Sequence, residues 1–290
     1  MVRTKAAVRK RKPGKSARRV RDDVYLHGYT THEQDRLYHQ AAFLADAVHD
    51  RLPFRRCRNV LEVGCGVGAQ TEILLRHFPK LAVTGVDRSA DNLRRAIAHL
   101  EQGAIGRGRF IAQEAAAETL PFAVDSFDGA FLCWILEHVA DPTRTLAEVR
   151  RVLRPGSPVV CSEVMNATFF LDPYSPNTLR YWRAFNDTQL AMGGDPFVGA
   201  KLGNLLLKNG FCDIRTEVKT FHLDNRVPGD RTEFLAYWSD LLLSGAPALA
   251  KAGKVPQEVV DGMQHELQRV ARDPDAVFWY SFVQARARVP

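Results

Sequence analysis

The chain has 290 residues, of which 46% are hydrophobic and 25% are charged, a composition typical of a globular protein with one large domain. No stretch approaches the about 18 uninterrupted apolar residues that a membrane-spanning helix needs. The five cysteines lie singly, without a C-x-x-C pair, so neither a disulfide framework nor a zinc site is expected. Because no secretory signal pattern is found either, we expect a soluble, cytoplasmic protein.

The net charge of +7 has its origin at the N-terminus, where ten lysine and arginine residues precede the first acid, Asp22. Residues 22–290 therefore carry a net charge of −3. Residues 1–21 have too few apolar side chains to form a folded element, so we expect a disordered basic arm. Such an arm is either a solvated tail or a docking element for nucleic acid or an anionic surface.

The pattern of apolar residues predicts an amphipathic helix over residues 33–50, followed by strands that alternate with helices. The strands are expected at 58–64, 81–87, 109–115, 126–136 and 158–164, and the helices at 69–79, 90–103 and 141–156. Strands separated by helices of this length form β-α-β units, which build a parallel sheet with right-handed crossovers.

The regular alternation stops after Val164. The chain continues as a loop over 165–178, helices over 179–192 and 198–210, a strand over 211–224, a helical insertion over 231–272 and a strand over 276–289. We therefore expect an α/β fold with a Rossmann-like, seven-stranded, mostly parallel sheet and helices on both faces. The predicted units are the arm (1–21), a helical lid (22–57), the cofactor-binding core (58–164), a cap insertion (165–198) and the rest of the sheet (199–290).

The segment "VLEVGCGVGAQT" (residues 60–71) is a buried strand that leads through a glycine turn into a helix. Gly64, Gly66 and Gly68, followed by alanine, satisfy the G-x-G-x-x-G/A pattern of dinucleotide sites, so the turn alone does not identify its ligand. Asp87 ends the next strand, where a carboxylate can accept hydrogen bonds from both ribose hydroxyls. The alternative role for Asp87 is to cap the helix that follows.

Glu62 narrows the choice of ligand, because a buried acid beside the turn would repel pyrophosphate but favour an ammonium group. Together with "VTGVD" (83–87), "AETLPFAVDSFDGAF" (117–131) and "ILEHVADPTRTLAEVRRVLRPGSPV" (135–159), this segment resembles the class I S-adenosylmethionine-dependent methyltransferases. The resemblance covers residues 60–164. It implies S-adenosylmethionine as cofactor and S-adenosylhomocysteine as product, with Glu62 and the glycine turn at the methionine part and Asp87 at the ribose.

One position departs from the family pattern, because many members carry an aspartate that contacts adenine where this chain has Ala116. Adenine recognition is therefore expected from the backbone around Ala117 or from the carboxylate of Glu118, with Arg88 along the ring. The segment "YLHGYTTHEQDRLYHQA" (25–41) resembles the N-terminal lid of a bacterial subgroup. The predicted cofactor residues are Tyr29, Arg36, Gln40, Glu62, Gly64, Cys65, Gly66, Gly68, Asp87, Arg88, Ala117, Glu118, Cys133 and Trp134.

In the lid, the resemblance implies that Tyr29 closes over the cofactor while Arg36 and Gln40 face its carboxylate, where a guanidinium can donate two parallel hydrogen bonds. The alternative for Arg36 is an ion pair with Glu33 on a solvated helix face.

Methyl transfer from a sulfonium requires alignment and exclusion of water, and a base only where the nucleophile starts protonated. His138 and its neighbour Glu137 follow the fourth strand and are the candidates, although a structural or cofactor-side role is equally open for His138. The residues expected to bind the acceptor are His27, Phe169, Phe170, Asp172, Tyr174, Tyr181, Trp182, Phe185 and Asn186. The same aromatic residues would also suit a plain hydrophobic cap on the sheet.

These observations predict a methyltransferase that acts on a nitrogen or oxygen atom of a small molecule, as in secondary metabolism. The chain has no N-P-P-Y motif of amino methyltransferases and no Pro-Cys nucleophile for pyrimidine C5 chemistry. A nucleic-acid or protein acceptor docked by the basic arm stays open as the alternative, since ten charges bind polyanions strongly at low salt.

Overall fold

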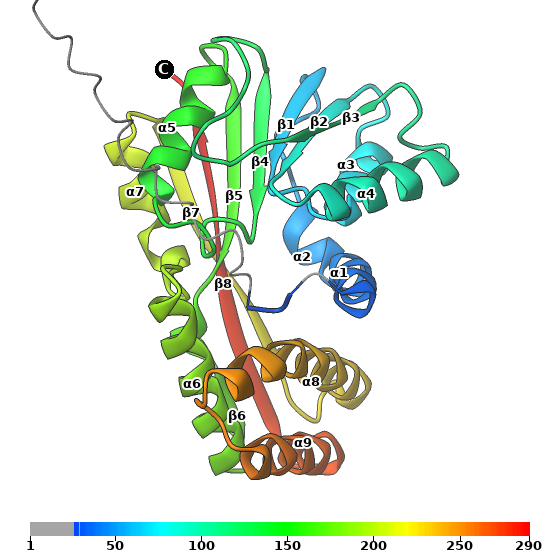
Figure 1. Ribbon diagram of the computed structural model, residues 1–290, viewed down its shortest axis with the longest axis vertical. Coiled ribbons are helices and arrows are strands. Elements are labelled where there is room, and N and C mark those ends of the chain that lie inside the picture. Colours follow the sequence, from blue (N-terminus) through cyan, green and yellow to red (C-terminus); the bar gives the residue numbers. More distant parts are fainter. Residues whose placement is uncertain (1–25, 29) are drawn as a thin grey trace, which may run out of the picture.

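The computed structural model describes residues 26–28 and 30–290. The predicted basic arm, residues 1–21, and Tyr29 therefore lie outside the described residues. The part of the chain that is described forms one mixed sheet with helices on both faces and a helical cap at one end (Figure 1). The predicted fold class is confirmed.

The sheet has the order β3-β2-β1-β4-β5-β8-β6. Strand β5 pairs with residues 282–288 of β8 and β6 with residues 277–279, while β7 pairs with β8 along almost its whole length. Its strands are β1 (Asn59–Val63), β2 (Ala82–Asp87), β3 (Phe110–Glu114), β4 (Gly129–Cys133), β5 (Pro158–Val164), β6 (Phe170–Asp172), β7 (Cys212–Leu223) and β8 (Val277–Arg288). The first five run parallel, whereas β8 is antiparallel to β5, β6 and β7. The described part thus has one strand more than the seven expected, because the three residues of β6 pair with the start of β8.

The helices lie close to their expected positions. They are α1 (Thr31–Phe43), α2 (Ala45–His49), α3 (Ala69–His77), α4 (Ala90–Gln102), α5 (Pro142–Val152), α6 (Pro176–Ala191), α7 (Leu202–Lys208), α8 (Pro228–Lys251) and α9 (Gln257–Arg272). The helix expected over 33–50 is divided at Leu44, whose backbone leaves helical geometry at φ −97° and ψ 7°. Three of these helices start with a side-chain cap, since Thr30 accepts from Glu33 N–H, Ser89 from Asn92 N–H and Asp141 from Arg144 N–H.

The central strands are buried on both faces, which explains why they read as continuous apolar runs. Successive residues of β1 point to opposite sides: Val60 packs in one hydrophobic cluster with α2 and α3, and Leu61 packs in the other with α5 and α7. Both side chains are fully buried. Figure 1 shows α3 and α4 on one side of the sheet and α5 and α7 on the other.

The cap consists of α6, α8 and α9, which lie around the far ends of the long strands β7 and β8 (Figure 1). Glu266 of α9 joins two of these helices, because its carboxylate accepts the backbone N–H groups of Asn177 and Thr178 at 3.0 and 2.8 Å. These donors lie in the first turn of α6, where a carboxylate satisfies N–H groups that have no partner within the helix. This contact holds α6 and α9 of the cap together.

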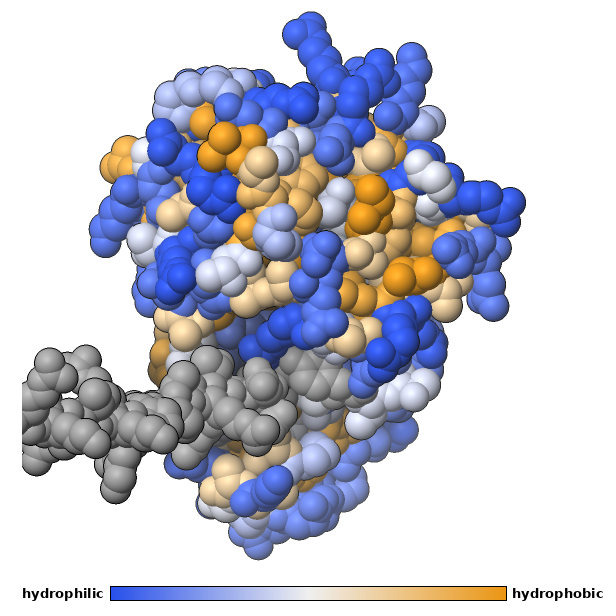
Figure 2. Space-filling model, turned by 45° about the horizontal axis from the view of Figure 1, so that its top comes forward, coloured by the Kyte–Doolittle hydropathy of each residue, from blue (hydrophilic) through white to orange (hydrophobic). Residues whose placement is uncertain are grey.

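No helix of the described chain is long and apolar enough to cross a membrane. On the face drawn in Figure 2, hydrophobic residues occur in small groups broken up by hydrophilic ones.

Candidate active site

The turn between β1 and α3 contains three glycines whose backbone conformation or surroundings disfavour a side chain. All three have positive φ, at +74°, +52° and +79° for Gly64, Gly66 and Gly68, a conformation that costs a side-chain-bearing residue free energy. A Cβ on Gly64 would lie 2.8 Å from Ile135, and one on Gly68 would lie 3.1 Å from Ala96. A Cβ on Gly66 would meet nothing within 4 Å. Gly66 therefore leaves room beside the backbone, on the wall of a cavity of about 830 Å³.

The cavity lies at the carboxyl ends of β1, β2 and β4, the edge where ligands bind in open α/β sheets. Helix α3 begins at this edge after Gly68, which makes no side-chain cap, so the first-turn N–H groups face the turn. These donors and the open turn suit an anionic or polar ligand of nucleoside size.

Asp87 lines the same cavity and ties two segments together. One carboxylate oxygen accepts the N–H of Gly66 at 2.9 Å, and the other accepts the N–H of Ser89 at 2.8 Å. Burial raises the pKa of Asp87 above its usual range. Ser89, not Asp87, is the N-cap of α4. Each carboxylate oxygen can accept a second hydrogen bond, so Asp87 retains acceptor capacity toward the cavity.

Glu62 and Gly68 are not among the residues that line the cavity. Glu62 lies behind the turn, only 2% exposed, and accepts a hydrogen bond from the Thr71 hydroxyl of α3 at 2.5 Å. Burial raises the pKa of Glu62 to about 8. Its observed contact joins β1 to the first turn of α3, so any effect on a ligand acts through the position of the turn.

Arg36 combines the two alternatives that the sequence left open. Its guanidinium donates two hydrogen bonds to Glu33, at 2.7 and 2.6 Å, and one to the Gln40 side chain at 2.7 Å. The pair with Glu33 is therefore present, but both side chains are buried instead of lying on a solvated face. Arg36 and Gln40 line the cavity, so α1 places a buried cation beside the glycine turn.

The loop after β4 carries Glu137 and His138, and both side chains line the cavity. Glu163 of β5 holds this loop, since its buried carboxylate accepts the N–H groups of Ile135 at 3.1 Å and Leu136 at 2.8 Å. The backbone of Trp134 has φ +53°, a strained geometry that turns the chain toward the cavity.

The two candidate bases differ in protonation. Burial, with Arg88 and Arg36 nearby, lowers the pKa of His138 to about 3, so its imidazole is neutral at physiological pH. Burial raises the pKa of Glu137 to about 7. The Glu137 carboxylate accepts a hydrogen bond from Gln189 of α6 at 2.8 Å and lies 3.6 Å from the His138 ring nitrogen.

The remaining predicted cofactor residues lie at the cavity. Its lining includes Cys65, Arg88, Ala117, Glu118, Cys133 and Trp134.

The predicted acceptor residues separate into three groups. His27, Trp182 and Phe185 line the cavity. Phe169, Tyr181 and Asn186 do not, but they support residues that do. Asn186 accepts from the side chain of Asn166 at 2.7 Å, Phe169 stacks on Trp238 with centroids 5.4 Å apart, and the ring centroid of Tyr181 lies 6.5 Å from that of Phe185.

Phe170, Asp172 and Tyr174 do not lie at the cavity, and the expectation fails for them. Phe170 and Asp172 belong to β6, which pairs with β8 at the outer end of the cap, and Tyr174 follows the strand. Phe170 is 54% exposed and Tyr174 is 71% exposed. For Phe170 and Asp172 the cause is the alternation of side chains in the strand, which buries Leu171 and directs its neighbours outward.

Sequence reasoning missed much of the aromatic wall. The unpredicted aromatic residues that line the cavity are Phe221, Phe234, Tyr237, Trp238, Tyr280 and Phe282. They come from β7, α8 and β8, far along the chain from the glycine turn. The sequence signals for them are the aromatic spacing "EFLAYW" at the start of the second insertion and the aromatic run "FWYSF" of residues 278–282.

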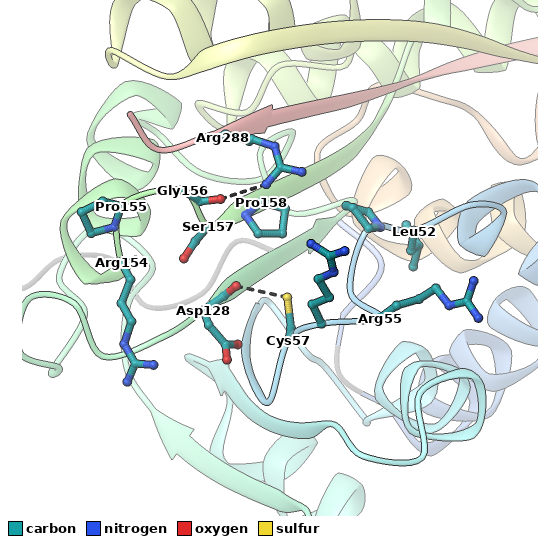
Figure 3. Close-up of a pocket in the computed structure, with 12 residues that line it drawn as sticks. Leu52, Arg55, Cys57, Asp128, Arg154, Pro155, Gly156, Ser157, Pro158 and Arg288 are labelled. Carbon is teal, nitrogen blue, oxygen red and sulfur yellow. Dashed lines mark hydrogen bonds between the residues drawn. The ribbon is translucent and has the colours of Figure 1, made fainter.

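A second cavity, of about 560 Å³, lies at the opposite edge of the sheet, where β1, β4 and β5 begin (Figure 3). Figure 3 shows Arg55 and Arg154 on different sides of it, with Asp128 between. Both oxygens of Asp128 already accept backbone N–H groups, from Arg58 at 2.8 Å and Asn59 at 2.9 Å.

Comparison with known proteins agrees with this geometry. A family described as a methyltransferase domain matches residues 61–161. An O-methyltransferase from Aspergillus sclerotiorum is 31% identical over 58% of this chain and 62% of its own length. An O-methyltransferase from Aspergillus nomiae is 32% identical over 58% of this chain and 70% of its own length. The chain thus spans less than two thirds of the first of these relatives.

A solved structure of geranyl diphosphate C-methyltransferase from Streptomyces coelicolor, in complex with S-adenosylhomocysteine, is similar in fold, with a TM-score of 0.51 and 15% identity. The similarity covers 87% of this chain and 76% of that protein. The glycine turn, Asp87 and the cavity fit the cofactor of this class. The chain belongs to the class I S-adenosylmethionine-dependent methyltransferases, and S-adenosylmethionine is its cofactor.

Proposed function

We propose that this protein transfers a methyl group from S-adenosylmethionine to an oxygen atom of a small molecule. The observation that carries the proposal is the single cavity of about 830 Å³ that extends from the glycine turn to the aromatic residues of α6 and α8. Its volume lies in the range of small-molecule sites. The relatives named O-methyltransferases support oxygen over nitrogen as the methylated atom.

The proposed cofactor contacts follow from the site. Asp87 accepts hydrogen bonds from the ribose hydroxyls, using the acceptor capacity that its two backbone contacts leave. The turn around Gly66 lies against the methionine part, and Arg36 with Gln40 faces its carboxylate. Ala117 and Glu118 lie where adenine would be bound.

The bound cofactor supplies an electrophilic methyl group on a sulfonium. The protein's task is to align an acceptor oxygen with that group and to exclude water from it. Helix α1 and the cap helices enclose the cavity between them and perform the second task. Glu137 and His138 lie between the turn and the cap, where the acceptor oxygen would have to be.

The test is the transfer of labelled methyl from S-adenosylmethionine into a size-fractionated cell extract, with Gly66→Val as the inactive control. The valine side chain would fill the space beside the turn and block the cofactor. Label in the low-mass fraction that depends on the native protein supports the proposal. Label only in RNA, DNA or protein would refute it and favour a macromolecular acceptor docked by the ten basic residues of the N-terminus.

A further inference from the structure

The acceptor side of the cavity is walled by aromatic rings. They belong to Trp182, Phe185, Phe221, Phe234, Tyr237, Trp238, Tyr280 and Phe282. Several rings are fixed against one another: Trp182 stacks on Phe185 at 5.5 Å and 11°, and Phe221 on Phe282 at 6.0 Å and 27°. Rings held in this way present flat apolar surfaces, which favour a flat apolar ligand by offset stacking.

Glu137 is a cavity-lining carboxylate held on the side of this wall, because Gln189 of α6, the helix that carries Trp182 and Phe185, donates to it at 2.8 Å. Among the cavity-lining carboxylates of the described chain, Asp87 and Glu118 follow β2 and β3 on the cofactor side. Glu137 instead interacts electrostatically with Tyr237 of α8 and Tyr280 of β8. Its position is well fixed, because Gln189 donates to its side chain and the N–H of Asp195 donates to its backbone oxygen at 2.9 Å.

We propose that the acceptor is a planar aromatic molecule methylated on a phenolic hydroxyl, and that Glu137 accepts the proton of that hydroxyl. This inference rests on the proposed function and adds the class of substrate and the role of one residue. The aromatic wall holds the ring, and Glu137 lies at the boundary between the wall and the cofactor turn.

The step balances without a further reactant. A lone pair of the phenolic oxygen forms the new bond to the methyl carbon, and the carbon–sulfur bond breaks with its electron pair left on sulfur. The phenolic proton passes to the Glu137 carboxylate and from there to solvent. The products are an aryl methyl ether and S-adenosylhomocysteine.

The acidity of the acceptor hydroxyl group favours a phenol over an aliphatic alcohol as the substrate. A phenol has a pKa of about 10, within reach of a carboxylate whose pKa burial raises to about 7. An aliphatic hydroxyl holds its proton about as tightly as water, with a pKa near 15.7. A neutral amine carries a lone pair and needs no base before it attacks, so a buried carboxylate beside the acceptor serves a phenol and not an amine.

Charged and titratable groups face Glu137 from every element packed around it. They are His138 on its own loop, Arg36 of α1, Cys133 of β4, Asp195 after α6, Tyr237 of α8, Tyr280 of β8 and Glu163 of β5. His138 is neutral above pH 4 because burial lowers its pKa to about 3. Glu137, with a pKa of about 7, is the candidate for an ionisation near neutrality in the rate. Because the pKa of Glu62 is about 8, the assignment requires that this ionisation disappears in Glu137→Gln.

The experiment uses the full chain, labelled S-adenosylmethionine and four matched compounds: 1-naphthol, decahydro-1-naphthol, 1-naphthylamine and 1-naphthoic acid. Mass spectrometry identifies each product, and calorimetry measures binding of each compound to the protein saturated with S-adenosylhomocysteine. We expect 1-naphthol to be methylated on oxygen, and to bind at least tenfold more tightly than its saturated counterpart. Methylation of the saturated alcohol, the amine or the acid in preference to the phenol would overturn the inference.

Glu137→Gln tests the role of the carboxylate. We expect kcat for 1-naphthol to fall by about 10²–10⁴ and its rise with pH through about 7 to disappear, while S-adenosylhomocysteine binding stays within twofold. An unchanged pH profile would overturn the role of Glu137. Arg154→Gln in the second cavity is the control variant and should leave kcat for 1-naphthol and its pH profile unchanged. Failure of the proposed function gives a different result, in which the protein binds the cofactor and methylates none of the four compounds but labels a macromolecule.

Discussion

Replacing Asp87 with alanine removes a carboxylate that accepts the backbone N–H groups of Gly66 and Ser89 at 2.9 and 2.8 Å. If the same carboxylate also binds the ribose hydroxyls, the variant loses one or two hydrogen bonds to a charged acceptor. That loss is about 1–3 kcal/mol of binding free energy, which corresponds to a dissociation constant about 5- to 150-fold higher. The free protein should lose only about 1 kcal/mol, because water at the cavity can replace the lost acceptor.

Calorimetry with S-adenosylhomocysteine measures the loss of binding free energy, and urea unfolding of the free protein measures the loss of stability. Asp91→Ala is the matched control, since Asp91 lies in the first turn of α4 but its side chain is 64% exposed and pairs with Arg94. Asp91→Ala should leave the dissociation constant unchanged. If Asp87→Ala bound S-adenosylhomocysteine as tightly as the native protein, the assignment of Asp87 to the ribose would be refuted.

Three further predictions concern buried charge and the N-terminus. Because burial raises the pKa of Glu62 to about 8, folding favours its protonated form, so the native protein should lose stability relative to Glu62→Gln as pH rises from about 4.5 to 8. Urea unfolding at several pH values checks this, and a constant difference between the two proteins would contradict it. Arg36→Ala removes the guanidinium that donates two hydrogen bonds to the buried Glu33 carboxylate, which should cost about 3–5 kcal/mol, whereas Glu33→Gln with Arg36→Met should recover most of the loss in thermal unfolding. Deleting residues 1–21 should leave kcat/KM for a small-molecule acceptor within twofold, and a large loss at low salt would instead assign the arm to substrate docking.

The core of the fold could be predicted from the sequence because its signals are local. The apolar runs of β1 and β2 and the helices between them follow directly from periodicity, and the glycine pattern places the turn at their boundary. Asp87 and Glu137 could be named for the same reason, because residues that follow parallel strands meet at one edge of the sheet. The alternatives for Arg36 could not be separated, since burial of the α1 face depends on α8 and α3 packing against it.

The acceptor wall could not be predicted because its residues come together only through long-range packing. Trp238 and Tyr280 lie on α8 and β8, with centroids 4.7 Å apart, although 41 residues separate them in the chain. Strand β6 has three residues and forms only by pairing with the start of β8, so no periodicity marks it. Because the sequence predicts a loop in place of β6, it places Phe170 and Tyr174 at the pocket, whereas in the structure both side chains are exposed.

The most direct test is a crystal structure of the protein with S-adenosylhomocysteine and 1-naphthol. We predict that the ribose hydroxyls lie within hydrogen-bond distance of the Asp87 carboxylate. The naphthol ring should lie among the aromatic residues of α6 and α8, with its oxygen between the cofactor sulfur and Glu137. Density for either ligand outside the cavity, or a naphthol oxygen directed away from Glu137, would contradict the proposal that one cavity aligns donor and acceptor.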